Sequence, residues 1–170
     1  MRELARPTAM YPTEAYDRFV VGGTALRYES ASGRGWELIA ERMLCVGEAT
    51  SESGPGEDWM LCFVTGVQGT WVEGSLLAES RNDALQWLSV RLGTSLELKL
   101  ANAPAFRSRV MWPPDLRDRP LFHYQVNPLR RAFSRWIRRL GSPPRAAVQS
   151  VQPEILERLW RGHRGAVHSA

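Results

Sequence analysis

Three apolar runs separated by short polar turns are the clearest pattern in the chain. They cover residues 41–52, 58–66 and 70–79, and a Gly-Pro-Gly break stands between the first two. Proline donates no backbone hydrogen bond and glycine readily takes a positive φ, so this break ends a strand. The pattern predicts a three-stranded antiparallel meander. Its middle strand, residues 59–64, is apolar at every position, so we expect both of its faces to be covered.

Shorter stretches in which apolar and polar residues alternate predict further strands. They are residues 24–30, 95–101, 108–112 and 121–126. In residues 95–101 three leucines alternate with polar residues, so one face of this strand should be buried. Before the first strand, residues 13–19 are expected to form a single helical turn.

A helix is predicted over residues 80–92, where apolar side chains recur at helical spacing. Ser80 is expected to cap the amide of Asp83, and Gly93 to end the helix in a left-handed conformation. The apolar line of this helix consists of Leu85, Leu88 and Leu92.

Residues 128–140 predict a second amphipathic helix. At 100° per residue, its six apolar side chains fall in one arc of about 140°, and every arginine lies outside that arc. Asn127 suits the cap of this helix and Gly141 suits its end. A linker of residues 142–152 should follow, then a short helix that ends at Gly162 and a frayed tail.

These elements predict an α+β fold, in which a curved antiparallel sheet is packed by the amphipathic helices at 80–92 and 128–140. Residues 1–141 are expected to form a single α+β domain. Residues 142–170 are expected to form the linker, the short C-terminal helix and the tail.

Charge is distributed unevenly along the chain. Residues 1–100 hold nine basic and fourteen acidic side chains, a net charge of −5, whereas residues 101–170 hold thirteen arginines and four acids, a net charge of +9. Such asymmetry is typical of proteins that contact nucleic acid, a membrane surface or an acidic protein. Arginine outnumbers lysine 21 to 1, which GC-rich coding also produces, so only the clustering is informative.

Sequence motifs of common enzymes and metal sites are absent. The chain has no phosphate-binding loop, dinucleotide fingerprint, nucleophile elbow or zinc-protease helix motif. The two cysteines, Cys45 and Cys62, lack metal-ligand spacing with the three histidines and are interpreted as buried strand residues, although a bridge across the hairpin stays open. The acidic turn with Glu52, Glu57 and Asp58 lacks the spacing of a calcium loop, so we interpret it as a solvated turn. We therefore expect no cofactor and no metal.

The first hairpin of the meander resembles that of an uncharacterised bacterial protein family with the pattern G-E-x-T, G-P and D-W. The resemblance covers about a fifth of the chain and implies no function. More loosely, a meander followed by strands and a closing amphipathic helix is similar to bacterial pleckstrin-homology-like domains, which implies a barrel-like sheet. The matching positions of the hairpin are Val46, Gly47, Glu48, Thr50, Gly54, Pro55, Asp58, Trp59 and Phe63.

Three interpretations of residues 128–140 remain open. The helix packs on the protein's own core with solvated arginines, it docks an acidic partner protein or a second copy of the chain, or its arginines meet the phosphates of lipid or nucleic acid. Burial of its apolar face would contribute on the order of 10 kcal/mol in transfer terms, which favours the first. A partner could also dock on residues 153–160.

The sequence thus favours a non-enzymatic binding or adaptor module, bacterial in character and cytoplasmic, that contacts an acidic partner or associates with itself. Peripheral binding to anionic lipid or non-specific binding to nucleic acid is the alternative, together with an enzyme of unfamiliar type. In the enzyme hypothesis His123 would act as a base with Asp115 or Asp118. The predicted contact residues are Arg130, Arg131, Arg135, Arg138, Arg139 and Trp160.

Overall fold

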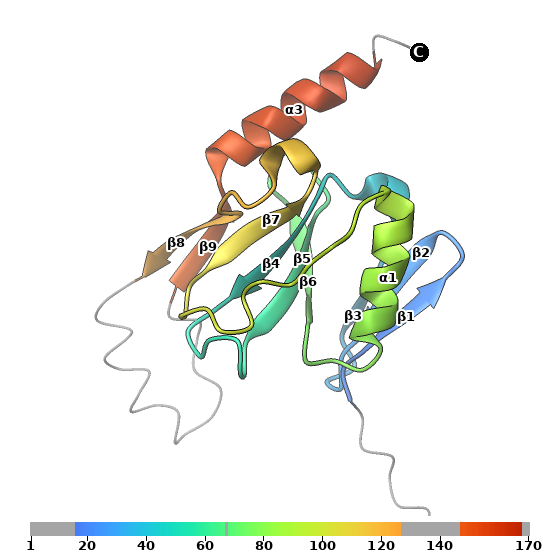
Figure 1. Cartoon of the computed structure of the whole chain (residues 1–170), viewed down its shortest axis with the longest axis vertical. Coiled ribbons are helices and arrows are strands. Elements are labelled where there is room, and N and C mark those ends of the chain that lie inside the picture. Colours follow the sequence, from blue (N-terminus) through green and yellow to red (C-terminus); the bar gives the residue numbers. More distant parts are fainter. Residues whose placement is uncertain (1–15, 67, 127–146, 168–170) are drawn as a thin grey trace, which may run out of the picture.

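The computed structural model of the chain describes residues 16–66, 68–126 and 147–167 (Figure 1). The helix predicted at 128–140 lies outside the described residues, and so do the five arginines that it carries. Within the described residues the chain forms antiparallel sheets and two α-helices, so the predicted α+β class is confirmed. None of the three described sheets closes into a barrel.

The central sheet contains the predicted meander. Its strands are ordered β6-β5-β4-β7, so the consecutive strands β4, β5 and β6 are neighbours and β7 joins the free edge of β4. Their bounds are β4 (Cys45–Thr50), β5 (Trp59–Val64), β6 (Trp71–Ser75) and β7 (Ser108–Trp112).

Both faces of β5 are buried, as predicted. Trp59, Leu61 and Phe63 point into one hydrophobic core, and Cys62 and Val64 point into a second core on the opposite face. A sheet with two covered faces needs a layer on each side. Figure 1 shows these layers on either side of the central sheet.

The N-terminal sheet and the first helix cover one face. This sheet has the order β1-β2-β3, and its strands are β1 (Arg18–Gly22), β2 (Ala25–Glu29) and β3 (Gly35–Ile39). The helix α1 (Arg81–Leu92) buries Ala84 and Leu88 in the same core.

An aromatic cluster joins the N-terminal sheet to the central one. The ring of Trp36 lies 5.7 Å from that of Tyr28 and 5.3 Å from that of Phe63, between centroids. The indole N–H of Trp36 donates to the backbone carbonyl of Glu73 on β6, at 2.8 Å. Gly74 allows this approach, because a Cβ there would lie 2.8 Å from ring atoms of both Phe19 and Tyr28.

The C-terminal strands and helix cover the other face. Here β8 (Phe122–Val126) pairs with β9 (Ala147–Val151), and α3 (Pro153–Val167) follows at once. Ile155 and Leu159, one helical turn apart, are buried against the second core. Among the described residues, no helix combines the length and apolar character required to cross a membrane.

Several local expectations were wrong. Residues 18 and 19, expected at the end of a helical turn over 13–19, begin the strand β1, and residues 35–39 form a strand that was not predicted. Residues 147–151, expected in a linker, form the strand β9. Its sequence does not show a buried apolar face, because the apolar Val148 points outward and is 65 % exposed. The last helix continues past Gly162, since an interior glycine weakens a helix without ending it.

The helix α1 ends at Gly93 in a left-handed conformation, as predicted, but its start differs from the prediction. Ser80 has a φ of 57° and forms no side-chain capping bond. A capping serine normally has an extended backbone, from which its hydroxyl reaches the exposed amides of the first turn. The left-handed backbone of Ser80 removes that geometry.

Replacement of Gly74 by alanine should destabilise the protein by about 1–3 kcal/mol, because the added methyl group overpacks the joint between the two sheets. Urea unfolding of G74A measures the change. The control is G56A, since a Cβ on Gly56 meets nothing within 4 Å. Equal stability of the two variants would contradict the close packing of the aromatic cluster.

Candidate functional site

The predicted contact residue that the structure describes is Trp160, on α3. Its side chain is 42 % exposed. The other predicted contacts, Arg130, Arg131, Arg135, Arg138 and Arg139, lie outside the described residues.

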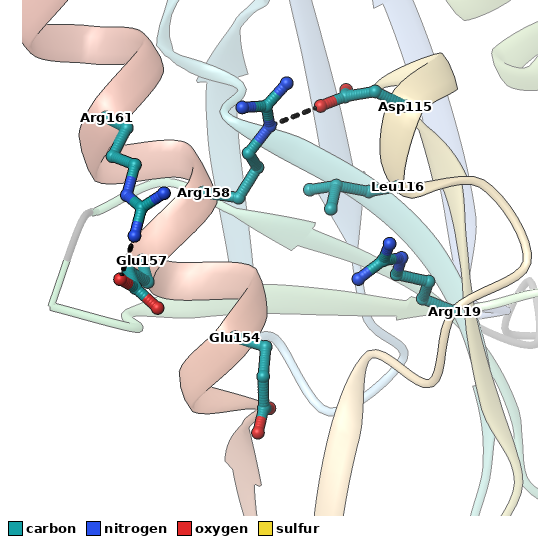
Figure 2. A pocket seen from close by; sticks show the side chains of 7 residues that line it. All are labelled: Asp115, Leu116, Arg119, Glu154, Glu157, Arg158 and Arg161. Carbon is teal, nitrogen blue, oxygen red and sulfur yellow. Dashed lines mark hydrogen bonds and ion pairs between the residues drawn. The ribbon is translucent and has the colours of Figure 1, made fainter.

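A groove of about 300 Å³ lies between α3 and the short 3₁₀-helix η2 (Pro114–Leu116). Figure 2 shows its charged side chains, which come from both walls. The buried side chain of Leu116 lies between them. The lining residues are Asp115, Leu116, Arg119, Glu154, Glu157, Arg158 and Arg161.

Two ion pairs use part of this charge. The Nε of Arg158 donates to Asp115 at 2.7 Å and so joins α3 to η2, whereas Arg161 pairs with Glu157 along the helix. Within the described part of the chain, the side chain of Arg119 has neither a hydrogen bond nor an ion pair. One wall of the groove thus presents a guanidinium group with all five donors unused.

The groove and Trp160 lie on different sides of α3. Burial of Ile155 and Leu159 fixes the rotation of the helix about its axis. At about 100° per residue, Trp160 points about 160° away from Arg158 and about 100° away from Arg161. A single small ligand in the groove would therefore not reach the Trp160 ring, although a larger partner could contact both surfaces.

The position of Arg119 is fixed by its backbone and by its neighbour. The amide of Val110 on β7 donates to the carbonyl of Arg119 at 2.8 Å, and the amide of Asp118 donates back to Val110 at 2.9 Å. Asp118 has a φ of 65°, a left-handed conformation that aspartate tolerates better than most residues. The loop after η2 is thereby attached to the edge of the central sheet.

The side chain of Asp118 attaches this loop a second time. Its carboxylate accepts hydrogen bonds from Lys99 Nζ at 3.2 Å and from Arg109 Nη1 at 2.8 Å. These bonds, that of Lys99 first, hold the pKa of Asp118 below its usual value of 3.8. Asp118 is therefore a carboxylate at neutral pH, and it bridges two basic side chains.

Arg109 connects the loop to a buried carboxylate, because it pairs with both Asp118 and Glu48. Glu48, on β4, has no exposed surface, and its Oε1 accepts from Arg109 Nε at 2.6 Å. It also accepts from the indole N–H of Trp59 at 2.9 Å and from the backbone amides of Lys99 at 2.7 Å and Leu100 at 3.3 Å. Four donors from three segments thus compensate one buried charge, as burial of a carboxylate requires.

This arrangement explains why residues 95–101 are not a strand. Their side chains alternate as predicted, with Leu96 buried and its neighbours exposed. The amides of Lys99 and Leu100, however, donate to the side chain of Glu48 instead of to a neighbouring strand. The Glu48 carboxylate thus bonds the two amides at the end of the segment, while Arg109 and Arg117 donate to its carbonyls at Glu97 and Ser95.

The hairpin residues on which the family resemblance rests have structural roles here. A Cβ on Gly47 would lie 2.5 Å from the carbonyl of Arg109, and Gly54 turns the hairpin with a φ of 73°. The hydroxyl of Thr50 donates to the carbonyl of Pro104 at 3.0 Å and accepts from the amide of Arg107 at 3.1 Å. Packing and hydrogen bonding account for these positions without a ligand.

The residues of the enzyme hypothesis do not form a catalytic arrangement. His123 is exposed on β8 and lies opposite Ser150 of β9. Asp115 is bound to Arg158, and Asp118 to Lys99 and Arg109. Neither carboxylate forms a hydrogen bond or an ion pair with His123.

Both cysteines are buried, as predicted, and the bridge that the sequence left open does not form. Burial raises the pKa of the Cys45 thiol to about 12, so it is protonated at neutral pH. No cluster of three or more metal-binding side chains occurs in the part of the chain that the structure describes. At the acidic turn, Asp58 accepts a hydrogen bond from Ser51 Oγ at 2.5 Å.

Comparison of the chain with protein-family models, with curated proteins and with solved structures gives no match.

The groove was not predicted from the sequence. Its charged residues come from the run D-L-R-D-R around residue 117 and from the surface of the last helix, about 40 residues later. Only the fold brings these two segments together. The one available signal was that all four acids of residues 101–170 lie in the same two segments as these arginines.

Replacement of Glu48 by glutamine should destabilise the protein by about 3–5 kcal/mol, because Arg109 then loses its fully buried counter-charge and one amide oxygen cannot accept four hydrogen bonds. Urea unfolding of E48Q measures this loss. E57Q, at the exposed hairpin tip, is the control and should change stability by less than about 0.5 kcal/mol. A loss for E48Q as small as that of the control would show that the buried network is not stabilising.

Replacement of Lys99 by methionine should raise the pKa of Asp118 toward 3.8, since the largest cause of its depression is removed while Arg109 remains. A depressed pKa contributes stability above 3.8 that is lost as the pH falls through the lower value of the folded state. The carboxyl carbon of Asp118, followed by NMR from neutral to acidic pH, reports the shift. An unchanged pKa of Asp118 in K99M would show that Lys99 is not the main cause of its low value.

Proposed function

We propose that the protein is a cytoplasmic, non-enzymatic binding or adaptor module whose basic C-terminal part contacts an acidic partner protein. The proposal rests on how the few acidic side chains of residues 101–170 are paired. Residues 101–170 hold four acids, and three of them, Asp115, Asp118 and Glu157, are bound to arginines of the same part. These acids cannot neutralise the remaining arginines, so a surplus of positive charge is left for a partner.

The proposed contact surface combines two sets of residues. The first set is on α3 and the loop after η2, where Trp160 is partly exposed and Arg119 has no side-chain partner within residues 16–66, 68–126 and 147–167. Tryptophan and arginine are the residue types that most often dominate the energy of protein interfaces. The second set is the predicted one, Arg130, Arg131, Arg135, Arg138 and Arg139, which would add charge to the same end of the chain.

A fluorescein-labelled decaglutamate peptide tests this function by fluorescence anisotropy. At low salt the protein should bind the peptide, and the affinity should fall as salt rises, because screening weakens contacts between exposed charges. A variant with Arg130, Arg131 and Arg135 replaced by glutamine should bind about tenfold more weakly, since each exposed charge contributes modestly. A variant with Arg18, Arg27 and Arg42 replaced by glutamine is matched in charge and should bind nearly as well as the wild type.

Vesicles containing an anionic lipid and a single-stranded oligonucleotide, tested in parallel, separate the alternatives. Preferential binding to the peptide supports a protein partner. Binding to vesicles or to the oligonucleotide without binding to the peptide would contradict the proposal and favour phosphate contacts.

A further inference from the structure

We propose that the groove between η2 and α3 is a carboxylate slot, which takes the side chain of one aspartate or glutamate from the acidic partner. The proposal rests on the function proposed above and assigns a specific recognition site within that surface. The groove lies in described residues, and its walls are an α-helix and a loop bonded to the central sheet.

The donors for a carboxylate are present and unused. Arg119 has no partner among the described side chains, and Arg158 binds Asp115 only through its Nε. The two terminal nitrogens of Arg158 therefore remain available. Figure 2 shows both guanidinium groups at the groove, with Leu116 between them. A planar guanidinium group binds a carboxylate through two parallel hydrogen bonds, which gives both strength and direction.

The charges of the groove favour a carboxylate over a phosphate. Three arginines are accompanied by the three acids Asp115, Glu154 and Glu157, so the lining has no net charge. A phosphate carries nearly two negative charges and would meet repulsion from those acids. A carboxylate carries one charge and can be satisfied by Arg119 and the free nitrogens of Arg158.

Part of the slot is arranged before a ligand binds. Asp115 pairs with Arg158 across the groove, and the backbone bonds of Asp118 and Arg119 to Val110 fix the loop from which the Arg119 side chain extends. Groups that are fixed in advance lose less conformational entropy on binding, which raises affinity. Asp115 also competes with an incoming carboxylate for Arg158, so it limits the affinity of the slot.

The test uses the decaglutamate peptide and three single variants of the full-length protein. R119Q should weaken binding about tenfold or more, because it removes the main donor of the slot. R107Q is the matched control, since Arg107 is exposed, belongs to the same basic part and has no side-chain partner among the described residues. It should weaken binding no more than about twofold, as an exposed charge outside the slot. D115N should strengthen binding about threefold or more, because it removes the internal competitor.

The outcomes separate this proposal from the function on which it rests. If R119Q and R107Q weaken binding equally, the slot is wrong but an acidic partner remains supported. If the wild type does not bind the peptide, both proposals are wrong. Inorganic phosphate that displaces the peptide more strongly than acetate at equal ionic strength would overturn the preference for a carboxylate. Equal urea midpoints for the three variants and the wild type ensure that folding is not the cause.

Discussion

The fold depends on one carboxylate that has no contact with water. Removal of an ionised carboxylate from water costs at least several kcal/mol, and each hydrogen bond to a charged group returns about 1.5–3 kcal/mol. Glu48 therefore needs all of its donors. Two of them come from strands that pair with β4, and two come from a segment that no backbone ladder connects to the sheet. Trp59 lies on the neighbouring strand, Arg109 lies on the strand at the other side, and the amides of Lys99 and Leu100 lie in a segment without a strand partner. The charge thereby holds an extended segment against the sheet.

The hydrogen-bond network of Glu48 extends to the proposed contact surface. Arg109 binds Glu48 in the core and Asp118 in the exposed loop, so a single guanidinium group connects the two. The residue after Asp118 is Arg119, whose side chain lines the groove and pairs with no other side chain that the structure describes. The second wall, α3, is held by Ile155 and Leu159 and by the pair between Arg158 and Asp115. The buried acid and the loop that carries Arg119 are thus joined through Arg109 and Asp118.

The sequence predicted those elements whose side chains follow one periodicity throughout. The meander of β4, β5 and β6, the buried cysteines and the end of α1 at Gly93 are confirmed. It failed where side chains replace backbone partners, as at residues 95–101, where Glu48 takes the place of a strand. The prediction also missed β9, because in this strand the polar Gln149 is half-buried while the apolar Val148 is exposed. The groove lay beyond prediction because its walls are distant in sequence and its pairs, such as that of Arg158 with Asp115, are set by packing alone.

Hydrogen exchange at the amides of Lys99 and Leu100 tests the role of Glu48 most directly. Both amides lie outside every strand of the described structure, so without their hydrogen bonds to Glu48 they would exchange as fast as those of an open loop. We expect exchange nearly as slow as in β4 and β5, because the bonds to the buried Glu48 carboxylate break only when the core opens. Fast exchange at these two amides, with slow exchange in β4 and β5, would contradict the central place of Glu48 in the fold.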